Sequence, residues 1–410
     1  MAAPEDQIGA LTLKLDQYSE SRYPVQRATT LFHLGTALLQ VDQSKEALQP
    51  LAEATRLFKS SGMALEQAKA ANMHGVALRT AGQTEAAVEA FLAALQQFHL
   101  GGHAVEEAAT SYNLGLAYRD ENALDRSRQA FTHAAQLFVA AGRFPEASAA
   151  AREQASILLK RGEIQEATDL LTPAVEMALR AGDMAGGGAA ANMLGLTHLA
   201  AGQNEAACTA FHDALGAHPR SVRPAENAMV RANLALALER CGDTARARLS
   251  AEHTLANPAA DLPVRIQVKE LLKRLPPATG SELFDVLEDT SESEWASVIR
   301  EELHRWAGSS TRTRNSCVAV WVHGQLQRRD MADQLAAGLL GGLLELPPTS
   351  FQLLVESIVA VVASLDDVGA PRIRAIVRSA MTRFAPPQWQ RLAAAFNAEA
   401  SRTHQPEEWS

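Results

Sequence analysis

The residues in this sequence that are best placed to do chemistry are a cysteine and a histidine four positions apart. On a helix, Cys208 and His212 would lie on one face and could offer a thiolate and an imidazole to a metal ion. A structural zinc site generally needs four such ligands, and no second pair in the sequence is spaced to complete the set. Surface or half-buried packing is therefore the better interpretation, and we predict no metal site.

A run of three glycines, Gly186–Gly188, is the second candidate, because backbone amides of glycine-rich loops can cradle a phosphate. It falls where a turn between two helices is expected, and we interpret it as a flexible turn. The sequence shows no P-loop, no dinucleotide-binding glycine pattern, no nucleophile elbow and no HExxH motif. We therefore predict no catalytic site, no cofactor and no enzymatic activity.

The composition narrows the classes of partner. The 410 residues carry a net charge of −9, whereas a nucleic-acid-binding protein would present a basic surface, so we predict no nucleic-acid partner. The stretches 331–346 and 351–365 are apolar but too short to span a membrane. The first residues lack the basic and apolar parts of a signal peptide. We expect a cytoplasmic protein without membrane insertion. Arginine outnumbers lysine 31 to 7, as is typical of a GC-rich bacterial genome.

The elements that would have to position any site are helices in a regular repeat, whose period is about 40 residues. Four columns keep this period without an insertion. Small residues stand at 35, 75, 115, 155, 195 and 235, and again at 47, 87, 127, 167, 207 and 247. Phe, Leu or Ala stands at 51, 91, 131, 171, 211 and 251, and a further column of Ala or Thr stands at 54, 94, 134, 174, 214 and 254.

Packing chemistry explains these columns. Small residues in the first two columns let the two helices of a repeat approach closely, and we expect the bulky third column to fill the space between neighbouring repeats. Glycines recur where helices must end, at 82, 162, 202 and 242 for the first helix and at 62, 102, 142 and 182 for the second. The pattern predicts an all-α fold, an α-solenoid of six helix-turn-helix repeats.

The small–small–aromatic–small spacing resembles the tetratricopeptide repeat over about Tyr23 to Pro258. The standard unit has about 34 residues, so the longer unit here is similar to the long-helix branch of Pins/LGN-type polarity adaptors, kinesin light chain, bacterial Rap regulators and the MalT solenoid. The segment from Ala181 to Leu215 is most similar to the Pins-type consensus. The resemblance implies a right-handed superhelix.

The resemblance also implies a binding groove, because in this family the first helix of each repeat lines the concave face. The groove positions carried over to this sequence are Asn72, Arg79, Tyr112, Asn113, Arg119, Arg152, Lys160 and Asn192. Amides pair with both N–H and C=O groups and guanidinium groups grip carboxylates, which favours a protein or peptide partner of acidic character. The alternative for these residues is an ordinary solvated helix face.

The predicted function is therefore a non-catalytic adaptor or scaffold that binds a partner protein or peptide in this groove. The alternative prediction is a signalling regulator of the Rap or MalT kind, in which a peptide or small ligand changes the pitch of the solenoid.

The remaining sequence divides where the repeat stops. We predict an N-terminal capping helix in 1–22 (Gln7 to Tyr18), repeats in 23–258, a capping helix in 259–275 (Asp261 to Leu275), an acidic linker in 276–293 and a helical C-terminal domain in 294–410. Its predicted helices are Glu294–Trp306, Cys317–Arg329, Ala332–Leu346, Phe351–Leu365, Arg372–Arg383 and Pro387–Ala400, with a capping box at Ser291 and Glu294.

Two features of this C-terminal part suggest interactions. Between Ser281 and Glu302 there are eight acidic residues and one basic residue. Such a run is usually a solvated helix surface. The alternative is that it folds back into the basic groove and competes with the partner. The apolar stretch Leu339–Leu344 suggests self-association through the C-terminal helices.

Overall fold

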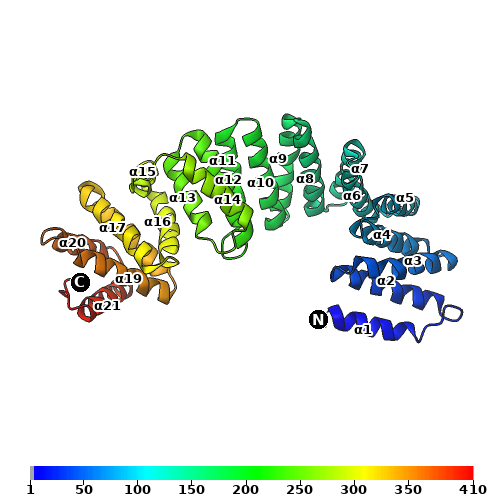
Figure 1. Cartoon of the computed structure of the whole chain (residues 1–410), viewed down its shortest axis with the longest axis horizontal. Helices are drawn as coiled ribbons and strands as arrows, with labels where there is room; N and C mark the ends of the chain where they lie inside the picture. Colours follow the sequence, from blue (N-terminus) through cyan, green and yellow to red (C-terminus); the bar gives the residue numbers. More distant parts are fainter. Residues whose placement is uncertain (1–3, 410) are drawn as a thin grey trace. The chain divides into compact units, whose positions relative to one another are not determined.

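The computed structural model describes residues 4–409 (Figure 1). Within that range the regular elements are 21 α-helices and one short 3-10 helix, with no strand, so the all-α α-solenoid prediction is confirmed. The internal contacts of the chain divide it into two compact units, one ending at Ala217 and the other beginning at His218.

Unit 1 contains the first 11 helices, coloured blue to green in Figure 1. Their bounds are α1 (Pro4–Leu15), α2 (Pro24–Gln40), α3 (Ser44–Ser60), α4 (Ala64–Thr80), α5 (Thr84–Gly101), α6 (Ala104–Asp120), α7 (Leu124–Ala140), α8 (Phe144–Arg161), α9 (Ile164–Arg180), α10 (Met184–Ala200) and α11 (Asn204–Ala217). Each helix packs against the next one along the chain, so α2 to α11 form five helix-turn-helix repeats. The N-terminal helix α1 packs on α2 and begins earlier than predicted, while the first three residues of the predicted cap lie outside the described residues.

A left-handed backbone residue ends the helices of unit 1 at regular steps of half a repeat. The positions are the glycines at 62, 82, 102, 142, 162, 182 and 202, together with Asp42 and Asn122. Glycine favours this conformation because it has no Cβ to clash, and Asn and Asp tolerate it better than other residues do. The series breaks at Val222, which has no positive φ, and it resumes at Gly242. The break follows α11, the shortest repeat helix of unit 1 at 14 residues, and lies close to the division between the units.

The first-column glycines are required by the aromatic rings that pack on them. A Cβ at Gly115 would lie 2.7 Å from Cε1 of Phe131, and a Cβ at Gly75 would lie 2.6 Å from the same atom of Phe91. Both rings are fully buried. The second column contacts the same helix, because Ser127 Oγ donates a hydrogen bond of 2.7 Å to the carbonyl of Gly115. The two helices of a repeat are therefore locked together at their closest point.

The glycine run Gly186–Gly188 is not a turn, contrary to our prediction. It lies in the first turn of α10, where Asp183 caps the helix by accepting a hydrogen bond of 2.9 Å from the Gly186 amide. A Cβ at Gly187 would overlap a methyl carbon of Leu179 on the preceding helix. The run therefore permits close helix packing and does not provide flexibility.

Unit 2 holds the sixth repeat together with the C-terminal helices. Its elements are α12 (Pro224–Cys241), α13 (Thr244–Leu255), α14 (Leu262–Arg274), α15 (Glu282–Glu288), α16 (Glu292–Ala307), α17 (Thr311–Gln327), the 3-10 helix η1 (Arg329–Met331), α18 (Ala332–Glu345), α19 (Pro348–Ala363), α20 (Gly369–Met381) and α21 (Pro386–Arg402). The capping helix α14 packs on α12 and α13, as a terminal cap of a repeat array does.

Helices α16 to α21 correspond to the six predicted C-terminal helices, and the capping box at Ser291 and Glu294 is confirmed. Helix α17 begins six residues before the predicted start, because Ser310 caps it by accepting a hydrogen bond from Thr313 N. The prediction missed α15, which lies inside the predicted linker. Its acidic residues indicated a solvated helix surface, and Asp285 and Glu288 are exposed, whereas Phe284 and Leu287 are buried in the C-terminal core.

The apolar stretch Leu339–Leu344 belongs to that core. Leu339, Leu340 and Leu343 are each at most 4% exposed and pack among the other buried residues of α16 to α21. The stretch therefore gives no support to the predicted self-association, since three of its four leucines are already buried within the unit and Leu344 is partly buried.

Candidate functional site

The predicted groove residues lie on the first helices of consecutive repeats in unit 1. Asn72 and Arg79 are on α4, Tyr112, Asn113 and Arg119 on α6, Arg152 and Lys160 on α8, and Asn192 on α10. First helices of neighbouring repeats approach one another, since α4 contacts α6 and α8 contacts α10, and the ion pair between Arg119 and Glu153 joins α6 to α8. Their side chains can therefore form one continuous face.

Two of the amides are brought together. Asn113 Nδ2 donates a hydrogen bond of 3.1 Å to Asn72 Oδ1, which joins α6 to α4. Lys160 is exposed at the end of α8, and Asn192 is only 7% exposed on α10. The hydrogen-bonding face is thus centred on α4, α6 and α8.

The three arginines of this face have different surroundings. Arg79 Nη1 donates a hydrogen bond of 3.0 Å to Asp120 Oδ2, and Arg119 pairs with Glu153 and lies 3.9 Å from Asp120 Oδ1. These two guanidinium groups are therefore already neutralised. Arg152 is half-buried, and within residues 4–409 it forms no ion pair with a carboxylate. Its Nε atom is buried without a hydrogen-bond partner.

Tyr112 lies between these charges. Its ring packs edge-to-face on Phe131, with the ring centroids 5.4 Å apart. Burial raises the pKa of Tyr112, and Glu153 acts in the same direction while Arg152 opposes it. The phenol therefore stays protonated and can donate a hydrogen bond to a carbonyl or a carboxylate.

Sequence reasoning missed Asp120 and Glu153, although the repeat register contained the signal. Asp120 stands one repeat before Lys160, and Glu153 stands one repeat after Asn113, so both occupy positions that we assigned to the groove. Searching those positions only for basic and amide residues concealed the carboxylates. We call the surface formed by Asn72, Arg79, Tyr112, Asn113, Arg119, Asp120, Arg152 and Glu153 the α4–α6–α8 face.

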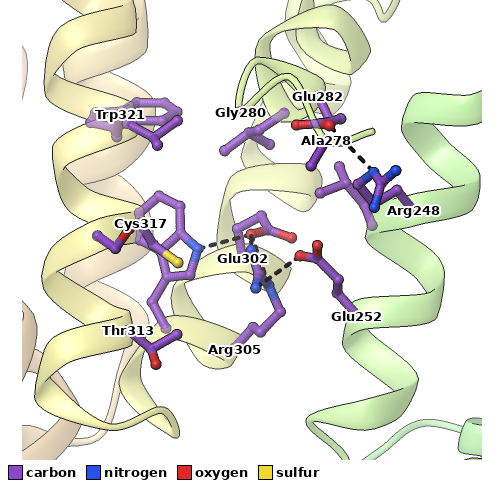
Figure 2. Close-up of a pocket in the computed structure, with 15 residues that line it drawn as sticks. Arg248, Glu252, Ala278, Gly280, Glu282, Glu302, Arg305, Thr313, Cys317 and Trp321 are labelled. Atoms are coloured by element: carbon purple, nitrogen blue, oxygen red, sulfur yellow. Dashed lines mark hydrogen bonds and ion pairs between the residues drawn. The ribbon is translucent and has the colours of Figure 1, made fainter. Parts of the chain in front are cut away.

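Unit 2 contains a second feature, a cavity of about 400 Å³ that the sequence analysis did not anticipate. Figure 2 shows it between α13, which carries Arg248 and Glu252, and α17, which carries Thr313, Cys317 and Trp321. Residues from α16 form its floor, and the segment around Gly280 closes one end. Its charged residues come from distant parts of the chain, which is why no local motif marks it.

Glu302 is the centre of the charged floor. It is 1% exposed and accepts hydrogen bonds from His253 Nε2 at 2.8 Å, Trp306 Nε1 at 2.9 Å and Arg305 Nη2 at 2.6 Å. Burial acts to raise the pKa of Glu302, but the hydrogen bond from His253 and the charge of Arg305 outweigh it and lower the pKa to about 2. Glu302 is therefore a structural carboxylate that remains ionised.

Glu252 and Cys317 have the opposite character. Burial raises the pKa of Glu252, with Arg305 opposing the shift and Glu302 adding to it. Burial also raises the pKa of the Cys317 thiol, which keeps it protonated and a poor nucleophile. The cavity can therefore bind through charge and apolar contact, but its thiol is not activated for attack.

The acidic segment 281–302 pairs with the sixth repeat. Asp289 accepts a hydrogen bond of 2.7 Å from Arg246, and Glu301 lies 2.6 Å from Arg231. Arg79 and Arg119, by contrast, pair with Asp120 and Glu153 of unit 1. Six of the eight acidic residues of the segment are exposed, which agrees with a solvated helix surface, and the fold-back into the groove stays a prediction.

The cysteine and histidine that the sequence offered as metal ligands are not part of a metal-binding group. Cys208 and His212 both lie on α11, and across the described residues no three His, Cys, Asp or Glu side chains form a group that could hold a metal ion. As far as residues 4–409 go, no helix has the length and apolarity needed to cross a membrane.

Comparison with known proteins finds one matching family model and several similar solved structures. The tetratricopeptide-repeat family profile matches residues 72–138 and 192–260. No curated protein matches the sequence. A putative kinesin light chain from Podospora anserina with TPR-like repeats is 17% identical, with a TM-score of 0.43, covering 49% of this chain and 99% of that one.

Two further solved structures are also similar. The apo form of RapI is 15% identical, with a TM-score of 0.45, covering 64% of this chain and 92% of that one. The apo form of the quorum sensor NprR from B. thuringiensis is 12% identical, with a TM-score of 0.47, covering 88% of this chain and 97% of that one.

Proposed function

Because the chain contains tetratricopeptide repeats, we propose that it is a non-catalytic adaptor that holds a segment of a partner protein on the α4–α6–α8 face. The observation that carries the proposal is Arg152, a half-buried guanidinium without a carboxylate partner among residues 4–409 and with a buried Nε that has no hydrogen-bond acceptor. An unpaired charge at a partly desolvated site is costly, and a carboxylate from a partner would remove that cost.

The net charge of the face limits the number of acidic groups that a partner segment can carry. Arg79, Arg119 and Arg152 contribute three positive charges and Asp120 and Glu153 contribute two negative charges, which leaves one net positive charge. A single carboxylate suits this face better than a run of acids, since additional acidic residues would meet Asp120 and Glu153. We therefore propose a partner segment with one acidic side chain or a free C-terminal carboxylate.

The neutral groups would supply the remaining contacts. The amides of Asn72 and Asn113 can each donate and accept, and the Tyr112 hydroxyl can donate, so an extended peptide backbone could pair with them. Their mutual hydrogen bond holds the amides in place before binding, which reduces the entropy lost on association.

The test uses a peptide selected on the protein itself. A random peptide library displayed on phage is selected against the full chain, and the affinity of the best peptide is measured by calorimetry for wild type and for Arg152→Gln. We expect the peptide to carry a carboxylate, and we expect Arg152→Gln to weaken binding about tenfold or more, because a charge-assisted hydrogen bond contributes about 1.5–3 kcal/mol.

The matched control is Arg180→Gln on α9, the second helix of the same repeat. Arg180 is a salt-bridged arginine with an 81% exposed side chain, and its loss should leave the affinity unchanged. Equal binding by wild type and Arg152→Gln would reject the α4–α6–α8 face as the site. Reversing the charge of Arg79 and Arg119 by substitution with glutamate is a poorer test. The new carboxylates would lie beside Asp120 and Glu153 and would repel them.

The alternative, a regulator that senses a peptide or small ligand, remains a prediction. It differs from the adaptor in that occupancy would change the spacing of the repeats, which small-angle X-ray scattering with and without the selected peptide would measure.

A further inference from the structure

We propose that the cavity of unit 2 binds an organic cation, a primary ammonium or guanidinium group carried on an apolar stem, with Glu252 as its counterion. The site is separate from the α4–α6–α8 face in residues and in chemistry, so it goes beyond the proposed adaptor function.

The expected charge of the ligand follows from the charged side chains that line the cavity. Glu252, Glu282 and Glu302 contribute three carboxylates, whereas Arg248 and Arg305 contribute two guanidinium groups. One negative charge is in excess at the cavity wall when His253, which hydrogen-bonds to Glu302, is neutral. A bound cation would balance it, whereas a bound anion would add to it.

The hydrogen bonds identify Glu252 as the carboxylate that is available to bind a cation. Glu302 accepts four donated hydrogen bonds from three side chains, and Glu282 accepts one of 2.8 Å from the Thr279 amide and lies 3.3 Å from Arg248 Nε. Glu252 shares Arg305 with Glu302, and only its Oε2 atom is paired, at 3.0 Å from Arg305 Nη1.

The second oxygen of Glu252 is therefore available. In the part of the chain that the structure describes, Oε1 accepts no hydrogen bond, and it is not among the buried atoms that lack a partner. Figure 2 shows the Glu252 carboxylate directed from α13 toward the cavity floor. The raised pKa of Glu252, caused by burial that Arg305 only partly offsets, agrees with a carboxylate whose charge is incompletely compensated.

The remaining wall is apolar and aromatic. Leu249, Leu283 and Val320 line the cavity together with the rings of Trp306 and Trp321. Aliphatic and aromatic groups of a ligand can pack on these side chains, and an indole face also attracts a cation. The volume of about 400 Å³ is within the usual range of small-molecule sites, roughly 300–1,000 Å³.

The test compares three probes of nearly equal shape and different charge on the full chain: phenethylamine, 2-phenylethanol and 3-phenylpropionate. Calorimetry should show phenethylamine binding about tenfold or more tightly than the alcohol, and the carboxylate binding more weakly than either. In Glu252→Gln the preference of the amine over the alcohol should fall to less than about threefold, because the substitution removes the charge and keeps the shape.

Three controls keep the result interpretable. Glu270→Gln on α14 removes an exposed carboxylate of the same unit and should leave the preference intact. Val320→Trp should fill the cavity and abolish binding of all three probes. Wild-type affinity for the amine should also fall as the pH decreases through the raised pKa of Glu252, because protonation removes the counterion.

The same chemistry could come from a free amine or from a lysine or arginine side chain of a peptide. An acetylated and amidated peptide with one arginine between leucines, compared with its glutamine counterpart, distinguishes these sources. Competition with phenethylamine by the arginine peptide alone would assign the site to a peptide side chain, and absence of competition would assign it to a small amine.

Equal affinity of wild type for the amine and the alcohol, or no binding of the amine, would overturn the proposal. So would an unchanged preference in folded Glu252→Gln. Neither result would bear on Arg152 and its peptide, since that test reads a different site.

Discussion

A single added methyl group at Gly115 is expected to destabilise unit 1, although alanine is the better helix former. The new Cβ would lie 2.7 and 2.8 Å from two carbons of the Phe131 ring, closer than the roughly 3.5–4.0 Å of a favourable carbon contact. Phe131 is fully buried and cannot swing away. Overpacking lowers the free energy of unfolding by about 1–3 kcal/mol, whereas replacing glycine by alanine in a helix raises it by about 1 kcal/mol.

The expected net effect of Gly115→Ala is a loss of about 1 kcal/mol in the free energy of unfolding. Gly9→Ala is the matched control, because Gly9 is also helical and a Cβ there would have no neighbour within 4 Å. It should gain up to about 1 kcal/mol, so the two identical substitutions should differ by about 2 kcal/mol.

The assay is urea unfolding followed by far-UV circular dichroism and by tryptophan fluorescence. All five tryptophans lie between Trp295 and Trp409, so fluorescence reports unit 2 while circular dichroism reports all helices. Gly115→Ala should move the circular dichroism transition more than the fluorescence transition.

A second substitution tests the mechanism. In the fourth repeat, alanine at 155 is paired with leucine at 171, so Gly115→Ala with Phe131→Leu copies a combination that the chain already contains. The double variant should be more stable than the sum of the single effects by about 0.5–3 kcal/mol, the usual range for contacting residues. Strict additivity, or a Gly115→Ala variant as stable as Gly9→Ala, would refute the packing argument.

Two further predictions concern the buried carboxylate and the left-handed turns. Because the folded pKa of Glu302 is about 2 and its ordinary value is 4.5, its contribution to stability is present above about pH 4.5 and is lost as the pH falls toward 2. That contribution is about 3 kcal/mol, so the fluorescence-detected stability of wild type should fall over this range far more than that of Glu302→Gln. At the turns, Gly82→Ala should cost about 1 kcal/mol in circular dichroism unfolding, whereas Asn122→Gly should be neutral or stabilising, since both positions have positive φ.

The repeat was predictable because each of its determinants is local and recurs. The small residue at 115, the ring at 131 and the left-handed glycine at 142 have counterparts in neighbouring repeats at the same register, and repetition distinguishes them from chance. Helix α15 was not predictable in this way. Its buried residues pack against tryptophans and leucines that are distant in sequence, and its acidic residues suggested an exposed segment.

The candidate sites show the same limit. The register predicted that Arg79, Arg119 and Arg152 share one face. It also placed Asp120 and Glu153 there, but it did not show that these carboxylates pair with Arg79 and Arg119. The cavity of unit 2 joins Glu252 to Glu302, which are far apart in the sequence, and no spacing rule connects them. Pairing between distant charges depends on packing that the sequence pattern does not specify.

The missing left-handed turn at Val222 marks the limit of the region in which additional repeats could be inserted. Repeat arrays lengthen by duplication of whole units, and the five repeats before His218 share interchangeable turns and packing columns. The sixth repeat keeps the same columns and the left-handed turn at Gly242, but its Arg231 and Arg246 are in addition paired with Glu301 of α16 and with Asp289, the residue that follows α15. A duplicated repeat would therefore be accommodated ahead of residue 217, whereas one inserted after 258 would separate those pairs. The C-terminal helices thus act as a fixed terminus, against which only the N-terminal part of the array is free to change in number.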